Sequence, residues 1–236
     1  DFEHRVLSLT EDGPIGERIR KLKVDVEILG MEKSLAWFHG YLKTGKVLRK
    51  LKSDLLQTWL YHSDYVGAQF SNIPVIWNIQ NGKLDPVQSP KTTRFVQRLC
   101  KNISTKPAAI IYCAEEAHKV HEDIGYRNHY QVVIENGVDQ EIYKPDPDNR
   151  YKMKQELGIS SQTKIIGHAG RYDAQKDYPT LITAFEKLAK LKDDVHFVLC
   201  GENLILKNIE LLSLIQKAGI GDRIHLLGMQ NEMEKV

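Results

Sequence analysis

Short apolar runs alternate with amphipathic stretches along the whole chain. Several of the runs are apolar on both faces, as in strands of a buried parallel sheet, and the stretches between them repeat apolar residues at helical spacing. This alternation predicts an α/β fold. We expect strands at residues 5–9, 24–29, 55–60, 74–79, 108–113, 130–134, 164–169, 196–200 and 223–227. We expect helices at residues 15–22, 35–51, 64–70, 92–102, 115–123, 150–157 and 206–218, and one that starts at Pro179.

One segment interrupts the alternation near the middle of the chain. Residues 141–149 are rich in Pro and Asp and predict an extended linker. A length of 236 residues fits two domains of ordinary size. We therefore predict two Rossmann-like parallel-sheet domains, residues 1–137 and 138–236, whose strand-end loops face each other across a cleft.

Composition narrows the class of protein. The 33 basic and 31 acidic residues leave a net charge of +2, so the overall charge does not indicate a nucleic-acid-binding protein. Cys100, Cys113 and Cys200 lack any CxxC spacing, so we expect buried thiols and neither a disulfide framework nor a metal site. No apolar run approaches the roughly 18 residues of a membrane span. These features predict a soluble, cytoplasmic protein.

The predicted helix at residues 35–51 and the residue after it carry basic side chains with no acid among them: Lys43, Lys46, Arg49, Lys50 and Lys52. Such a helix can lie on an anionic membrane surface, which would make the protein peripheral to the inner face of the membrane. The alternative is an ordinary solvated face of a core helix. The pattern alone leaves both open.

The stretch from Lys164 to Phe185 combines features of an anion site. A strand breaks at Gly170, a loop carries Arg171 and Lys176, and a helix begins near Pro179. A helix N-terminus offers free N–H groups, and two cations add full charges, so the loop could hold a diphosphate. A solvated loop with two surface cations remains the alternative.

Other polar residues follow predicted strands, where an open α/β sheet binds its ligands. In the first domain they are His62, Asp64, Gln80, Asn81 and Lys83, and in the second they are Gly201, Glu202, Asn203 and Gly228. His62 could equally cap a helix or pack in the core. Glu202 could contact a sugar hydroxyl or a ribose, or be a simple turn residue.

Several motifs together carry a family resemblance. Val133-Ile134-Glu135-Asn136-Gly137-Val138-Asp139, Tyr143-Lys144-Pro145, Leu157-Gly158, Gly170-Arg171 and Gln175-Lys176 occur in this order. Their order and spacing resemble the retaining glycosyltransferases of family 4 (glycosyltransferase group 1), which have the GT-B fold. Residues 57–64 and 75–79 are similar to a bacterial polysaccharide-type subgroup.

The resemblance implies a function. Such an enzyme passes a sugar from a nucleotide donor, UDP- or GDP-linked, to a carbohydrate or lipid-linked hydroxyl acceptor with retention, in polysaccharide or glycolipid synthesis. Arg171 and Lys176 match the family's two diphosphate-binding cations. Gly201-Glu202 and Gly228-Met229 match regions around the nucleoside. The first domain would supply the acceptor surface, and no metal is needed.

The chain also departs from the family pattern. The glycine-rich loop of the first βα unit and the E-x7-E motif are absent, so we expect a chain truncated at both ends. Gln80 stands where many relatives have a histidine, so the resemblance gives the first domain no catalytic residue, and His62 is only a weak candidate. An inactive fragment or a non-catalytic nucleotide-binding module is therefore an alternative. A dinucleotide-dependent oxidoreductase would need a G-x-G-x-x-G motif, and none follows any predicted strand.

Overall fold

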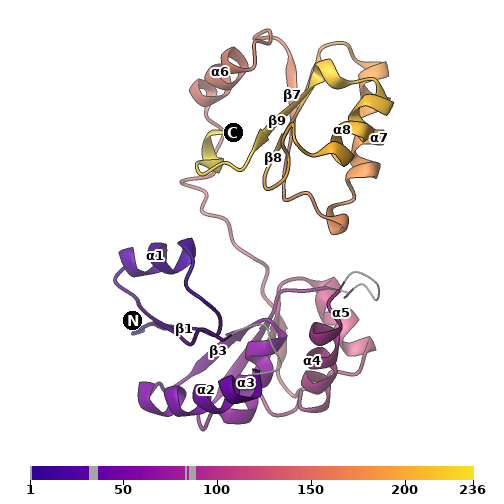
Figure 1. The fold of residues 1–236 in the computed structure, drawn as a ribbon. Helices are drawn as coiled ribbons and strands as arrows, with labels where there is room; N and C mark the ends of the chain where they lie inside the picture. The colour runs from indigo at the N-terminus through magenta and orange to yellow at the C-terminus, as the bar shows by residue number, and fades with distance from the viewer. Residues whose placement is uncertain (1, 32–36, 83, 85–88) are drawn as a thin grey trace. The chain divides into compact units, whose positions relative to one another are not determined.

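The computed structural model describes residues 2–31, 37–82, 84 and 89–236. It divides into two compact units, residues 1–137 and 138–236 (Figure 1). Each unit has its own hydrophobic core. The predicted α/β class with parallel sheets is confirmed, since every strand pair is parallel.

The first unit contains a parallel strand pair and a four-stranded parallel sheet with strand order β3-β4-β5-β6. The pair is β1 (Arg5–Ser8) and β2 (Asp25–Ile28), joined through α1 (Pro14–Lys21). The larger sheet consists of β3 (Leu56–Trp59), β4 (Val75–Ile79), β5 (Ala109–Tyr112) and β6 (Gln131–Val133). Its helices are α2 (Trp37–Leu51), α3 (Tyr61–Phe70), α4 (Lys91–Asn102) and α5 (Glu115–Asp123).

The core of the first unit lies between this sheet and its helices. Trp77 on β4 and Tyr112 on β5 are fully buried and pack with Tyr61 of α3 and Cys100 of α4. Helix α3 packs between α2 and α4. The core therefore fixes the loops and helix starts that follow β3 and β4, where the acceptor-side candidates lie.

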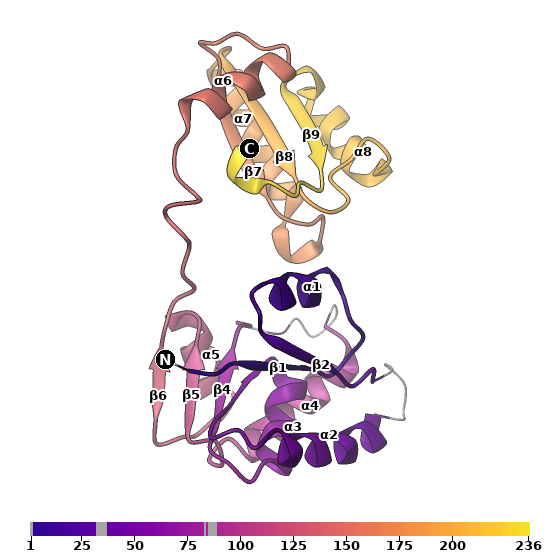
Figure 2. The same cartoon turned by 90° about the vertical axis from the view of Figure 1, so that its left-hand side faces the viewer.

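The second unit is built on a three-stranded parallel sheet with strand order β7-β8-β9. Its elements are α6 (Pro147–Glu156), β7 (Lys164–Ala169), the 3₁₀ turn η1 (Ala174–Lys176), α7 (Tyr178–Leu191), β8 (Val195–Cys200), α8 (Ile209–Ala218), η2 (Gly221–Arg223), β9 (Ile224–Gly228) and η3 (Met233–Lys235). Helices α7 and α8 cover one face of the sheet, and α6 lies on the other side (Figures 1 and 2). Phe185 of α7 stacks on Phe197 of β8 with ring centroids 4.1 Å apart.

Helices α6, α8 and α3 each begin three residues away from the predicted start, for local reasons. Helix α6 begins at Pro147, inside the predicted linker, because Asp146 accepts hydrogen bonds from two backbone N–H groups of the first turn. Helix α8 begins at Ile209 because Asn208 caps it in the same way. Helix α3 begins at Tyr61, directly after Leu60 turns the chain with a φ of 73°. Polar caps, rather than apolar spacing, set the first two starts.

No helix in the part of the chain that the structure describes is long and apolar enough to cross a membrane.

Candidate functional site

Three loops at the carboxyl ends of β7, β8 and β9 are joined by backbone hydrogen bonds. The Gly170 N–H donates to the Cys200 carbonyl oxygen at 2.9 Å, and the Tyr172 N–H donates to that of Glu202 at 2.8 Å. The Gly201 N–H donates to the Gly228 carbonyl oxygen at 2.7 Å. The structure thus brings together the second-unit loops that the sequence predicted as candidates.

Gly201 is the closest point of contact between two of these loops. Its φ of 139° is a conformation that side chains other than glycine rarely adopt. A Cβ atom at this position would lie 2.1 Å from the Gly170 carbonyl oxygen. Glycine at 201 therefore lets the loop after β8 lie directly against the loop that carries the two cations.

The cations lie on a loop that is ordered by one carboxylate. Asp173 accepts from Arg171 Nε at 3.2 Å and from the Gln175 N–H at 2.9 Å, and these two hydrogen bonds lower the pKa of Asp173, the Gln175 one more strongly. The Arg171 side chain is 56% exposed and gives only its Nε to Asp173. Lys176 is exposed and forms no ion pair with any residue that the structure describes. Both cations are therefore available to an anion from solvent.

Helix α7 starts beside these cations. Asp177 accepts from the Thr180 N–H at 3.3 Å as the helix cap and has a left-handed φ of 47°. Tyr178 is buried, and its hydroxyl donates to the Gly170 carbonyl oxygen at 3.1 Å. The helix N-terminus is thus fastened to Gly170, where its partial positive charge adds to the charges of Arg171 and Lys176.

The remaining predicted residues of this unit lie along the same edge. Glu202, Asn203 and Met229 are exposed. Asn203 has a φ of 61°, and its carbonyl oxygen accepts from Asn208 Nδ2 at 2.9 Å, which ties this turn to the start of α8. Gly228 has a φ of 64° and ends β9.

The sequence did not single out three residues of this site: His168, Asp173 and Tyr178. Their signals are visible afterwards. His168 is the polar residue in the otherwise apolar run from Ile165 to Ala169. Asp173 and Asp177 each precede a turn as helix-capping residues do, and Pro179 marks the first turn of α7.

In the first unit the structure corrects one candidate. Asp64 was expected as an acceptor-side residue at the start of a helix, but it lies within the first turn of α3 and is buried. Its Oδ1 atom is 2.6 Å from Thr58 Oγ1, and burial raises the pKa of Asp64 well above its ordinary value. Asp64 is thus a core residue and does not line an acceptor surface. His62 lies in the same turn and is partly buried, which lowers the pKa of its imidazole.

Gln80 joins two segments of the first unit. Its Nε2 donates to Asn78 Oδ1 at 2.6 Å, and its Oε1 accepts from Asn136 Nδ2 at 2.9 Å. The loop after β4 is thereby held to the segment after β6. Asn81 is partly exposed beside it, and Lys83 lies outside the described residues.

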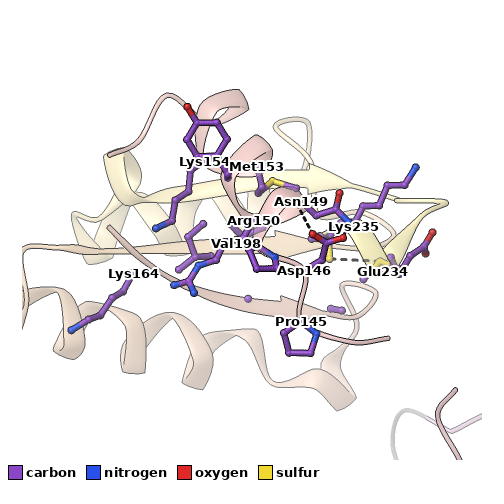
Figure 3. A pocket seen from close by; sticks show the side chains of 18 of the residues that line it. Pro145, Asp146, Asn149, Arg150, Met153, Lys154, Lys164, Val198, Glu234 and Lys235 are labelled. Carbon is purple, nitrogen blue, oxygen red and sulfur yellow. Dashed lines mark hydrogen bonds between the residues drawn. The ribbon is translucent and has the colours of Figure 1, made fainter. Parts of the chain in front are cut away.

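A cavity of about 1080 Å³ lies on the α6 side of the second-unit sheet (Figure 3). Gly167, Ala169, Val198 and Cys200 line it from the sheet. Residues 144–147, 149–151, 153 and 154 line it from α6 and the segment before that helix, and residues 233–236 line it from the C-terminal turn. Arg171 and Lys176 are not among its lining residues. His168 of the strand-end site does line the cavity, so the cavity reaches that site at this residue.

Comparison with protein families gives a match in this unit. Residues 149–236 match the family model described as Glycosyl transferases group 1. The matched range includes Arg171, Lys176 and all three joined loops. A search of curated proteins found no similar sequence.

Comparison with solved structures gives matches across both units. HepE (Alr3699) from Anabaena, in complex with UDP and glucose, is 22% identical with a TM-score of 0.79, over 98% of this chain and 63% of HepE. A glycosyltransferase from Rickettsia africae is 17% identical with a TM-score of 0.69, over 98% of this chain and 61% of the other. Sucrose-phosphate synthase from Thermosynechococcus elongatus is 16% identical with a TM-score of 0.65, over 86% and 52%. These matches confirm the GT-B fold, and the chain spans less than two thirds of each of these proteins.

Proposed function

We propose that this chain is a glycosyltransferase that binds a nucleoside-diphosphate sugar through its second unit. One observation carries the proposal. The group 1 glycosyl transferase match covers residues 149–236 of this unit, where Arg171 and Lys176 lie just before a helix N-terminus at the carboxyl edge of a parallel sheet. That edge is where open α/β sheets bind nucleotides.

The two cations would stabilise the leaving diphosphate electrostatically. When the bond between the sugar and the diphosphate breaks, negative charge builds on the leaving diphosphate. Preorganised cations that face this charge lower the barrier to the reaction. Arg171 has free Nη groups and Lys176 a free ammonium for this role, and the α7 N-terminus adds N–H groups.

The finer parts of the proposal come from the motif resemblance and from the relatives. HepE has complexes with UDP and with UDP-glucose, so we take a UDP sugar as the first donor to test and a GDP sugar as the second. Glu202, Asn203 and Met229 would lie near the nucleoside. Retention of configuration and a role in polysaccharide or glycolipid synthesis follow from the resemblance to family 4.

The first unit would receive the acceptor. Gln80 and Asn81 lie after β4, and His62 lies at the start of α3 with its pKa lowered by burial, so its imidazole is neutral near pH 7 and able to accept a proton. His62 is the weak catalytic candidate, tested by His62→Ala in a transfer assay.

Contact with a membrane would use helix α2, where Lys46 and Lys50 are exposed. Binding to vesicles of anionic lipid should fall in Lys46→Glu/Lys50→Glu and persist in the α1 control Arg18→Glu/Lys21→Glu. Equal binding of the two variants would contradict this part of the proposal.

The proposal is tested by UDP binding followed by turnover. Calorimetric titration of the 236-residue chain should detect UDP or GDP, and release of nucleoside diphosphate from the matching sugar donor should follow with a hydroxyl acceptor. Binding without release would favour the non-catalytic nucleotide-binding module. Failure to bind either nucleotide would contradict the proposal.

A further inference from the structure

Gly170 has no conformational reason to be a glycine. Its φ lies outside the left-handed region that Gly201 and Gly228 occupy. The space around it gives a different reason. A Cβ atom at Gly170 would lie 3.2 Å from His168 Nε2, 3.7 Å from the Tyr178 hydroxyl and 3.8 Å from Lys176 Cδ. Glycine thus leaves a small opening bordered by an imidazole nitrogen, a phenol oxygen and a lysine side chain.

The imidazole nitrogen at this opening is unpaired. His168 Nε2 is buried and has no hydrogen-bond partner among the described residues. The Tyr178 hydroxyl uses its proton on the Gly170 carbonyl oxygen. The Tyr178 ring also packs edge-on against His168 with centroids 5.5 Å apart, which holds the imidazole in place. Buried polar atoms in folded proteins nearly always have a partner, so this nitrogen calls for one that the protein does not supply.

The position of this nitrogen suggests its partner. His168 lies in β7, two residues before Gly170, and its Nε2 atom borders the same opening as the Lys176 side chain. We infer that His168 Nε2–H donates a hydrogen bond to a phosphate oxygen of the nucleoside diphosphate, through the opening that Gly170 leaves. This inference rests on the proposed function and adds a third side-chain donor, from the strand, to the two cations of the loop.

Lys176 would control access to the nitrogen. Its side chain borders the opening and is exposed, so it can move at little cost. A diphosphate that draws the Lys176 ammonium onto itself would move that side chain off His168 Nε2. Binding to Lys176 and binding to His168 are therefore coupled in this arrangement.

Calorimetric titration of the whole chain with UDP tests the inference. His168→Phe keeps a flat ring without a donor and should weaken UDP binding about tenfold, the size expected for a hydrogen bond to a charged group. His168→Gln restores an N–H near the same position and should recover part of that loss. Unchanged UDP affinity in His168→Phe would overturn the inference.

Gly170→Ala provides a second, independent variant. Its backbone conformation is open to alanine, and the added Cβ fills the opening without removing either cation. Gly170→Ala should also weaken UDP binding about tenfold. The double variant Gly170→Ala/His168→Phe should bind UDP about as well as the single variant with the lower affinity, because both changes remove the same contact. Additive losses of about 100-fold would overturn the inference.

Two further readouts separate this inference from the proposed function. Arg171→Ala tests the diphosphate site itself. If Arg171→Ala loses UDP binding while His168→Phe retains it, only the role of His168 fails. If a variant does not fold, the ¹⁵N resonance of His168 Nε2 in the unaltered chain decides. It should shift on saturation with UDP, and an unmoved resonance would overturn the inference.

Discussion

Replacing Gly201 by alanine tests whether the contact between the loops positions the cations. The new methyl group would lie 2.1 Å from the Gly170 carbonyl oxygen and 2.6 Å from its carbon. Real Cβ atoms do not come within 3.0 Å of such atoms, so the two loops must separate by roughly 1 Å. Gly170 would then move away from β8 and take Arg171 with it.

The cost of this change has two parts. Holding alanine at a φ of 139° costs about 1–3 kcal/mol. Separation of the loops weakens the hydrogen bonds from Gly170 to Cys200 and from Tyr172 to Glu202, each of which contributes about 1 kcal/mol. We expect the free energy of unfolding of the second unit to fall by about 3–4 kcal/mol.

The chain allows this unit to be observed separately. Trp37, Trp59 and Trp77 all lie in the first unit, so tryptophan fluorescence reports that unit alone. Urea unfolding of Gly201→Ala should shift the transition seen by circular dichroism and leave the fluorescence transition unchanged. UDP affinity should fall as well, because Arg171 moves with Gly170.

Gly219→Ala is the matched control. Gly219 has a φ of 66° at the end of α8, and nothing lies within 4 Å of the position of its Cβ. It should cost only about 1 kcal/mol, with UDP affinity unchanged. The reasoning fails if the two variants are equally stable. It also fails if Gly201→Ala is destabilised but binds UDP as tightly as Gly219→Ala.

Three further predictions concern stability. Burial raises the pKa of Asp64 above 3.8, so the first unit should lose stability as pH rises above about 4. Asp64→Asn lacks this loss, so its stability relative to the unaltered chain should increase as pH rises from about 4, measured by urea unfolding followed by fluorescence. His196 Nδ1 and His225 Nε2 lie 2.9 Å apart. Burial lowers the pKa of both histidines, and the charge of Arg223 adds to this effect on His196, as His196 does on His225. The second unit should therefore lose stability as pH falls below 6.5, and His196→Gln/His225→Gln should flatten that loss in circular dichroism. Asp146→Ala should cost about 1 kcal/mol through loss of the α6 cap, measured by thermal unfolding.

Each of these predictions has an outcome that would contradict it. Parallel pH profiles for Asp64→Asn and the unaltered chain would mean that Asp64 is ionised in the folded state. An unchanged slope in the double histidine variant would mean that this pair does not control the acid loss. Asp148 shares the first turn of α6 but caps nothing, so a loss in Asp148→Ala as large as that in Asp146→Ala would rule out the cap.

Much of the fold could be predicted from the sequence because most strands are apolar and the three strands of the second unit end at or directly before a glycine. Strand β7 has the predicted bounds because a change from apolar residues to Gly170 ends it. Helices α6 and α8 begin elsewhere because Asp146 and Asn208 cap them, and a polar cap cannot be told from a loop residue by apolar spacing alone.

The sequence predicted which residues of the candidate site lie together only where those residues are close in sequence. Arg171 and Lys176 share one loop, so their proximity needed no tertiary information. The contact of Gly201 with Gly170 depends on the pairing of β7 with β8. Asp64 was misassigned because its partner Thr58 lies on β3, and only the packing of α3 turns the carboxyl group into the core.

The central claim is that Arg171 and Lys176 hold a nucleoside diphosphate. The most direct test is calorimetric titration with UDP of the unaltered chain, Arg171→Ala/Lys176→Ala and the control Lys187→Ala/Lys217→Ala. The control removes two exposed cations elsewhere in the same unit. We predict that the site variant loses at least about 100-fold in affinity, as for two charge-assisted hydrogen bonds, and that the control stays close to the unaltered chain. A site variant that binds UDP as tightly as the control would contradict the account.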